Sequence, residues 1–292
     1  MIYLLLSISV NALLIIAFKI FPRLGINNFQ AIIANYYTAS ILGFILSGKN
    51  PLRVENLHQE WLMPIIILGF MFISLFYLIS LTTEKIGISV ASVSNKMSVV
   101  IPVTLAVFLY GESLSFIQIS GIFLAVIAVV LVSMRKEEGE HAVISNTMKL
   151  ALPTILFLGC GALDALINFV QFKLVNREFS NEFLLSSGFS IAGLIGTIVL
   201  LLLTISGKQK IHGKSLLAGL LLGIPNFFSM FMVMLALESG FFQASEFFPI
   251  NNIGIVVLST AIGFLFLKEQ LSFLNKAGIL LSVLAILLLA FG

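Results

Sequence analysis

The sequence has few charged residues, and this excludes most classes of soluble protein. Only 10% of its 292 residues are Asp, Glu, Lys or Arg, against about 25% in soluble domains. Hydrophobic residues make up 59% and the mean hydropathy is +1.13. Because too little polar surface remains to cover a soluble globule, a cytosolic enzyme and a disordered chain are both excluded. Cys160 is the single cysteine, so the fold depends on no internal disulfide.

Motifs for catalysis and cofactor binding are missing as well. The three histidines, His58, His141 and His212, fall in polar stretches and do not have metal-ligand spacing. The sequence has no Gly-rich phosphate loop, no HExxH motif and no paired-aspartate site. We therefore expect a protein that is not an enzyme, with no metal, no cofactor and no nucleic-acid partner. The net charge of +3 is better explained by membrane topology.

Ten long apolar runs occupy most of the chain. A helix needs about 20 apolar residues to cross a hydrocarbon core about 30 Å thick. Runs of this length cover residues 2–22, 28–47, 61–83, 87–110, 115–134, 149–172, 183–206, 215–237, 241–267 and 272–291. They predict an all-α polytopic membrane protein with ten transmembrane helices in the lipid bilayer.

The two halves of the chain are weakly similar to each other. A displacement of 154 residues pairs Leu68-Gly69 with Leu222-Gly223, and one of 157 pairs Glu112-Ser113-Leu114-Ser115-Phe116 with Glu269-Gln270-Leu271-Ser272-Phe273 and Gly121 with Gly278. We predict a first five-helix repeat over residues 1–134, a polar linker over 135–148 and a second repeat over 149–292. Five crossings leave the chain on the other side of the membrane, so the second repeat is inverted. Inverted repeats are typical of secondary transporters with a substrate site near the midplane.

The junction between spans 4 and 5 carries a recognisable pattern. It reads Gly111-Glu112-Ser113-Leu114 with Gln118 and Gly121, and the second half repeats it as Lys268-Glu269-Gln270-Leu271 with Gly278. With ten spans in two repeats, the whole chain resembles the EamA-type exporters of the drug/metabolite transporter (DMT) superfamily. The resemblance implies alternating access around a cavity lined by spans 1, 3, 4, 6, 8 and 9. It does not identify the substrate.

Three charged residues lie inside predicted spans: Lys96 in span 4, Asp164 in span 6 and Glu246 in span 9. One charge at the centre of a helix costs about 2.5–3.5 kcal/mol on insertion scales. With a rise of about 1.5 Å per residue, the two acids fall at one depth and Lys96 about 8 Å from them along the membrane normal. This predicts either a structural ion pair or a zwitterionic ligand that bridges the lysine and an acid.

Polar and aromatic residues of the expected cavity helices complete the candidate substrate-binding set: Asn11, Tyr77, Asn95, Asn168, Asn226 and Asn252. The alternative for any single asparagine or serine is an interhelical hydrogen bond worth about 0.6 kcal/mol. Ser89 and Ser92 share a helical face with Asn95 and Lys96, which favours a polar surface on span 4. Structural roles are expected for Glu112 and Glu269, which precede helix starts. Ser115 and Gln118 are spaced as a capping box.

Together these features predict a secondary transporter of a small-molecule substrate, acting in the inner (cell) membrane of a bacterium as a monomer or a homodimer. The expected cargo is a small metabolite, such as an amino acid or a related amphipathic solute, moved outward. Lys96 would hold an anionic group, and Glu246 or Asp164 would hold a cation or exchange a proton. Two alternatives stay open: an efflux carrier for drugs or lipophilic cations, and a membrane sensor or receptor that does not transport.

Basic residues are distributed unequally between the two membrane sides. The side opposite the termini has eleven: Lys19, Arg23, Lys85, Arg135, Lys136, Lys149, Lys208, Lys210, Lys214, Lys268 and Lys276. The side of the termini has four: Lys49, Arg53, Lys173 and Arg177. The positive-inside rule therefore places the termini outside the cytoplasm, whereas the family resemblance implies the reverse orientation.

A cysteine at position 141 tests the orientation. In a Cys160→Ser background, the charge distribution predicts that His141→Cys reacts with a membrane-impermeant maleimide only after the cells are permeabilised. Labelling in intact cells would instead support the orientation implied by the family.

Overall fold

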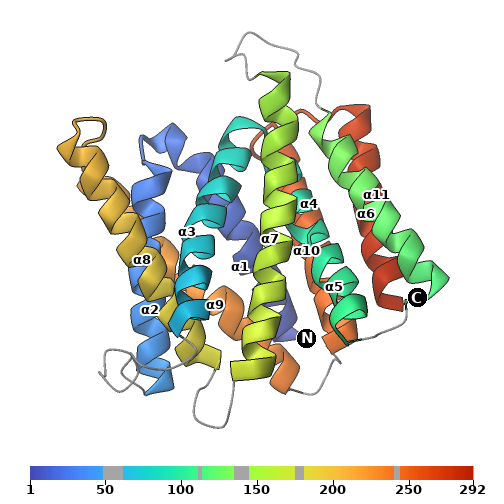
Figure 1. The fold of residues 1–292 in the computed structure, drawn as a ribbon. Helices are drawn as coiled ribbons and strands as arrows, with labels where there is room; N and C mark the ends of the chain where they lie inside the picture. The colour runs from blue at the N-terminus through green and yellow to red at the C-terminus, as the bar shows by residue number, and fades with distance from the viewer. Residues whose placement is uncertain (49–61, 111–113, 135–144, 175–180, 240–243, 292) are drawn as a thin grey trace. The chain divides into compact units, whose positions relative to one another are not determined.

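The protein is built from helices, as the computed structural model in Figure 1 shows for residues 1–48, 62–110, 114–134, 145–174, 181–239 and 244–291. The described residues form α1 (Ile2–Ile20), the short 3-10 helix η1 (Pro22–Leu24), α2 (Asn28–Ser47), α3 (Leu62–Lys85), α4 (Ile88–Met97), α5 (Val100–Tyr110), α6 (Phe116–Ser133), α7 (Asn146–Leu174), α8 (Asn181–Ile205), α9 (Gly213–Glu238), α10 (Ala244–Leu265) and α11 (Phe273–Phe291).

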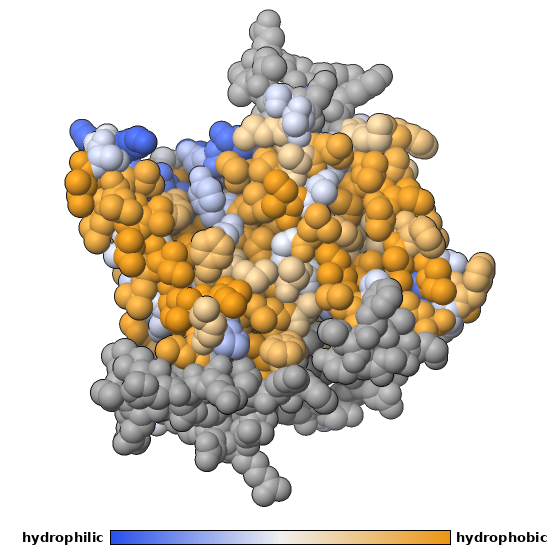
Figure 2. All heavy atoms as spheres, in the orientation of Figure 1, coloured by the Kyte–Doolittle hydropathy of each residue, from blue (hydrophilic) through white to orange (hydrophobic). Residues whose placement is uncertain are grey.

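Ten helical stretches in these parts of the chain are long and apolar enough to cross a membrane. The all-α, ten-span prediction is therefore confirmed. Helices α4 and α5 together supply one of the ten, Ile88–Leu105. Helices suit a bilayer because each pairs its own backbone polar groups, which lipid cannot do. Apolar residues accordingly cover most of the visible face in Figure 2, and hydrophilic residues gather at the upper end of α8.

The chain packs as two compact units that do not follow the order of the sequence. Unit 1 comprises Met1–Ile20, Leu78–Ala162 and Ser229–Gly292, and unit 2 comprises Phe21–Tyr77 and Leu163–Phe228. The boundaries at residues 77, 162 and 228 fall inside α3, α7 and α9. Each unit therefore draws helices from both predicted repeats.

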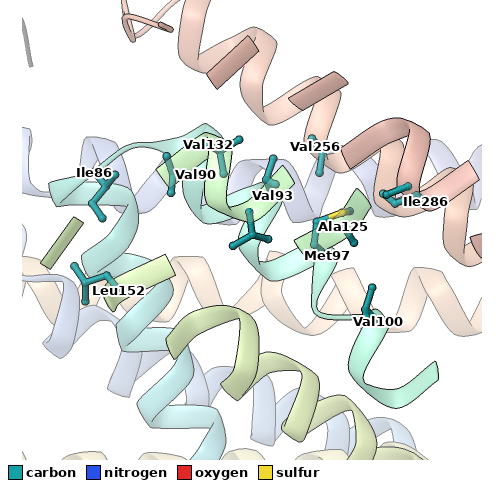
Figure 3. Packing of buried hydrophobic residues seen from close by; sticks show 12 residues of the cluster. Ile86, Val90, Val93, Met97, Val100, Ala125, Val132, Leu152, Val256 and Ile286 are labelled. Atoms are coloured by element: carbon teal, nitrogen blue, oxygen red, sulfur yellow. The ribbon is translucent and has the colours of Figure 1, made fainter. Parts of the chain in front are cut away.

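The core of unit 1 forms where α4 and α5 pack with α6, α10 and α11. Val90, Val93 and Met97 recur at helical spacing on α4, and all three are buried. Val256 of α10 and Ile286 of α11 belong to the same cluster, which Figure 3 shows along α4. This packing fixes one face of α4 against apolar neighbours.

Helices α6 and α11 lie side by side in unit 1 (Figure 1), and each has a glycine at their contact. A Cβ on Gly121 would lie 3.1 Å from the carbonyl oxygen of Ala285, and one on Gly278 would lie 2.9 Å from that of Ala128. Gly121 and Gly278 are 157 residues apart, and so are Ala128 and Ala285. This reciprocal packing is consistent with the predicted inverted repeat.

In unit 2, α2 packs against α8 and against the first part of α9. The Tyr37 hydroxyl bonds with Thr197 Oγ1 at 2.9 Å. A Cβ on Gly223 of α9 would lie 2.6 Å from the carbonyl oxygen of Asn35 on α2, whereas one on Gly69 of α3 would lie 3.1 Å from the amide nitrogen of Ala192 on α8. Gly69 and Gly223 are the pair related by 154 residues, so unit 2 repeats the pattern of close approach.

Gly278→Ala should destabilise the protein because the new methyl group meets main-chain atoms of α6, which cannot move away independently. We expect a loss of about 1–3 kcal/mol, the usual cost of overpacking. Gly213→Ala is the matched control, since a Cβ there has no neighbour within 4 Å. Thermal unfolding in detergent compares the two variants. A melting temperature equally unchanged in both would contradict the close packing of α6 and α11.

Candidate functional site

Unit 1 contains a break in span 4, two residues after Lys96. Helix α4 ends at Met97 and α5 begins at Val100. At the turn, the amide of Ile101 donates to the Ser98 carbonyl oxygen at 2.9 Å, three residues back and not four as in an α-helix. Pro102, in the first turn of α5, has no N–H to donate. Figure 3 shows Met97 and Val100 on the two sides of this turn.

Lys96 lies at the middle of the span, because it is the ninth residue of the 18-residue stretch Ile88–Leu105. Its side chain and that of Asn95 are partly buried. Lys96 is in the last turn of α4, where a cation interacts favourably with the negative end of the helix dipole. The positive end of α5 begins only a few residues later. Lys96 is therefore a cation beside a helix N-terminus at mid-membrane depth.

The serines of α4 do not share the surroundings of Lys96. Ser92 is fully buried, and its hydroxyl bonds with Ser259 of α10 at 2.7 Å. Ser89 is 1% exposed, and its hydroxyl donates to the Glu269 carboxylate at 3.1 Å. The expectation that these two serines form part of an open polar surface is wrong. They join α4 to its neighbours, because the face of α4 that carries them packs against α10.

Glu269 holds the start of α4. Its carboxylate accepts hydrogen bonds from the amides of Ile88 at 2.7 Å and Ser89 at 3.3 Å. We expected Glu269 to stabilise the helix that follows it. Instead it caps a helix about 180 residues earlier in the chain. The first-turn amides of α4 need an external acceptor because Gly87, which precedes the helix, has no side chain to cap them.

The connection between α3 and α4 is held by a positive charge, that of Lys19. Lys19, at the end of α1, donates from Nζ to the carbonyl oxygens of Thr83 and Glu84, both at 3.1 Å. These carbonyls lie in the last turn of α3, where a cation is favourable. Lys19 therefore has a specific structural partner and does not simply extend toward the membrane surface.

Of the predicted asparagines in unit 1, Asn11 and Asn252 lie near a contact between α1 and α10. Ser7 of α1 donates to the side chain of Asn251 at 3.0 Å, and Asn11 donates to the Ser7 carbonyl oxygen at 2.9 Å. Asn252 is partly buried next to Asn251. Asn251 thus joins the two helices, and Asn252 stays a candidate.

The remaining predicted charges are distributed over the two units. Asp164 belongs to α7 in unit 2 and has an exposed side chain. Asn168 is one turn further along α7, and Glu246 is the third residue of α10 in unit 1. The side chains of these last two lie outside the described residues. The predicted bridge between Lys96 and an acid therefore stays a prediction.

Unit 2 contains the other two candidates and one residue that sequence reasoning did not select. Tyr77 is 41% exposed and its ring packs edge-on against Phe29. Asn226 of α9 is buried. Asn35 of α2 is completely buried, and neither polar atom of its side chain has a hydrogen-bond partner among the described residues. Nothing in the sequence distinguishes Asn35 from the other asparagines.

Among the described residues, no three His, Cys, Asp or Glu side chains are close enough to hold a metal ion together. Unit 1 instead has the partly buried amide of Asn95 and ammonium group of Lys96 at the end of α4. Groups of these kinds can bind a polar solute and then release it.

Comparison with known proteins agrees with this architecture. A sequence model described as the EamA-like transporter family matches residues 1–134. An uncharacterized protein of Haemophilus influenzae is 30% identical over 285 residues, which cover 96% of this chain and 93% of that protein. The chain belongs to the EamA-like transporter family. It is thus an integral multi-pass membrane protein and a transporter of the DMT superfamily.

A solved structure shares the fold of this EamA-family chain. A protein whose crystal structure is known aligns with a TM-score of 0.61 over 98% of this chain and 94% of its own, at 15% identity. An identity this low supports the fold alone. Family membership implies a small-molecule substrate and a lipid environment, and points to transport and not to catalysis.

Proposed function

We propose that this EamA-family transporter exports a small amphipathic metabolite with an anionic group, such as an amino acid, across a bacterial inner membrane. The observation that carries the proposal is the break in span 4 next to Lys96. Transporters of inverted-repeat architecture commonly bind substrate where a helix is discontinuous near the midplane. The partial positive charge at such a helix start attracts anionic substrate groups.

Lys96 supplies the recognition of the anionic group in this proposal. A lysine at the centre of a span costs about 2.5–3.5 kcal/mol on insertion scales, and such residues usually mark substrate or ion pathways. Ser89 and Ser92 on the same helix are used for packing, whereas Asn95 and Lys96 lie at its interrupted end. The polar groups of α4 thus divide into structural ones near its start and candidate ligands at its end.

The remaining candidates extend the proposed site. Asn11, Asn95 and Asn252 of unit 1 would contact the uncharged part of the substrate. Glu246 or Asp164 would bind its cationic group or exchange a proton during the cycle. A zwitterionic metabolite satisfies both kinds of charge.

The alternative function is an efflux carrier for lipophilic cations. Replacing Lys96 distinguishes it from our proposal. A cation at position 96 repels cationic substrates, so replacing Lys96 would improve transport by such a carrier. Under our proposal the same replacement reduces transport.

Untargeted metabolite profiling identifies the substrate. We expect one amphipathic anion or zwitterion to accumulate in the medium of cells that produce the protein, compared with cells that carry an empty vector. No difference in the medium, together with no uptake of amino acids by vesicles containing the purified protein, would favour a sensor or receptor that does not transport.

Replacing Lys96 then tests the site. In proteoliposomes, Lys96→Ala and Glu246→Gln should each reduce the initial rate for that metabolite about tenfold or more, the effect of losing about 1.4 kcal/mol or more of charge-assisted binding. Lys276→Ala is the control, because it removes an exposed lysine near the start of α11. Undiminished transport by both site variants at matched protein levels would refute the charged site.

A further inference from the structure

The start of α4 is capped from a distant segment, and this cap is fixed in place by the backbone around it. Glu269 is 8% exposed and accepts from the amides of Ile88 and Ser89 and from the Ser89 hydroxyl. Its own amide donates to the Gly263 carbonyl oxygen at 2.9 Å. The backbone amide of Glu269 is therefore bound to α10, and its carboxylate is bound to α4.

Two backbone features adapt the connection between α10 and α11 to this contact. Lys268 has a φ of 55°, the only positive φ of a non-glycine residue in the described part of the chain. Such a conformation is unfavourable for a lysine and persists where surrounding contacts require it. At Gly263, a Cβ would lie 2.9 Å from Glu269 Oε2, so the absence of a side chain there leaves room for the carboxylate.

The contact matters for the proposed site because α4 is a short, separate helix. It has ten residues and ends at the break after Met97. A continuous helix would be held in place at both ends, whereas α4 has the turn at Ser98–Val99 at one end. A shift of one residue along this helix would move Lys96 by about 1.5 Å and turn it by about 100°. The fixed point at Ile88 and Ser89 therefore sets both the depth and the direction of Lys96.

The end of α3 is held in a matching way. Lys19 binds the last carbonyls of α3, and the Glu269 carboxylate binds the first amides of α4. The short connection between these helices therefore has a cation at one end and an anion at the other. Each charge faces the helix end of opposite polarity. The connection is thereby prevented from sliding in either direction.

We propose that Glu269 is a positioning residue for the substrate site: by capping α4 from the connection between α10 and α11, it holds Lys96 at its working depth. This inference rests on the proposed function for its meaning in transport. Its structural content, that Glu269 determines where residue 96 lies, is independent of any substrate.

The test measures the chemical accessibility of position 96. In a Cys160→Ser, Lys96→Cys background, the purified protein is treated with N-ethylmaleimide and the alkylation rate is followed by mass spectrometry. We expect Glu269→Ala to change the rate about fivefold, the factor that corresponds to the loss of one helix cap. Glu269→Gln, which keeps the shape and one acceptor oxygen, should lie between Glu269→Ala and the background. If Glu269→Ala does not fold, the alkylation rate of Glu269→Gln is compared with that of the background, and an unchanged rate would overturn the proposal.

Glu84→Gln is the matched control. Glu84 lies in the last turn of α3, shortly before the start of α4, and its carboxylate pairs with Lys85 at 3.0 Å. Its replacement removes the same charge without touching the α4 amides, so we expect the alkylation rate at position 96 to stay unchanged. An effect of Glu84→Gln equal to that of Glu269→Ala would show that net charge matters and not the cap, and would overturn the proposal.

Hydrogen exchange of the same variants, with Lys96 intact, separates a local cap from a positioning role. Faster exchange at Ile88 and Ser89 with an unchanged alkylation rate at position 96 would mean that Glu269 only caps α4, and would overturn the proposal. Neither readout needs a transported substrate. A changed alkylation rate combined with normal transport by Lys96→Ala would leave the positioning role intact and refute the proposed substrate site instead.

Discussion

Helix ends inside or near a bilayer need partners from the protein, because the first amides and last carbonyls of a helix have no bond within it and lipid offers none. Several described helix ends receive a side chain from far along the chain. Glu269 binds the start of α4 and Lys19 the end of α3. Asn275 donates to the Val132 carbonyl oxygen near the end of α6 at 2.6 Å. The buried side chain of Gln30 donates to the Lys210 carbonyl oxygen and accepts from the His212 amide, which joins α2 to the connection before α9. These long-range contacts join helices and connections that are far apart in the sequence.

The break in span 4 creates two further helix ends in the middle of a span. It lies beside Lys96, a basic residue. A charged side chain and an interrupted helix are both unfavourable at mid-membrane depth. Their coincidence within three residues, from Lys96 to Ser98, is the physical basis for proposing a substrate site here. Ser92 of α4 bonds with Ser259 of α10, and Ser89 donates to Glu269 in the connection that follows α10. Both serines therefore have structural partners, and the proposed ligands lie at the other end of α4.

Glycine contacts give the two units their close packing and relate the halves of the chain to each other. In unit 1 the contact of Gly121 with α11 is mirrored by that of Gly278 with α6, and in unit 2 the contact of Gly69 with α8 is mirrored by that of Gly223 with α2. Such reciprocal contacts between residues at a fixed displacement are consistent with an inverted repeat.

Features that depend on neighbours along the chain were predictable from the sequence. The ten spans follow from the length of the apolar runs, and the capping box of Ser115 and Gln118 is present as its spacing predicted. The repeated glycines and glutamates were visible as well, but not their contacts. Only the tertiary structure decided that Ser89 and Ser92 face α10 and that Glu269 caps α4 and not its own helix. The reason is physical: hydrophobic length and local capping are properties of a single segment, whereas the partner of a buried polar group depends on which helix packs beside it.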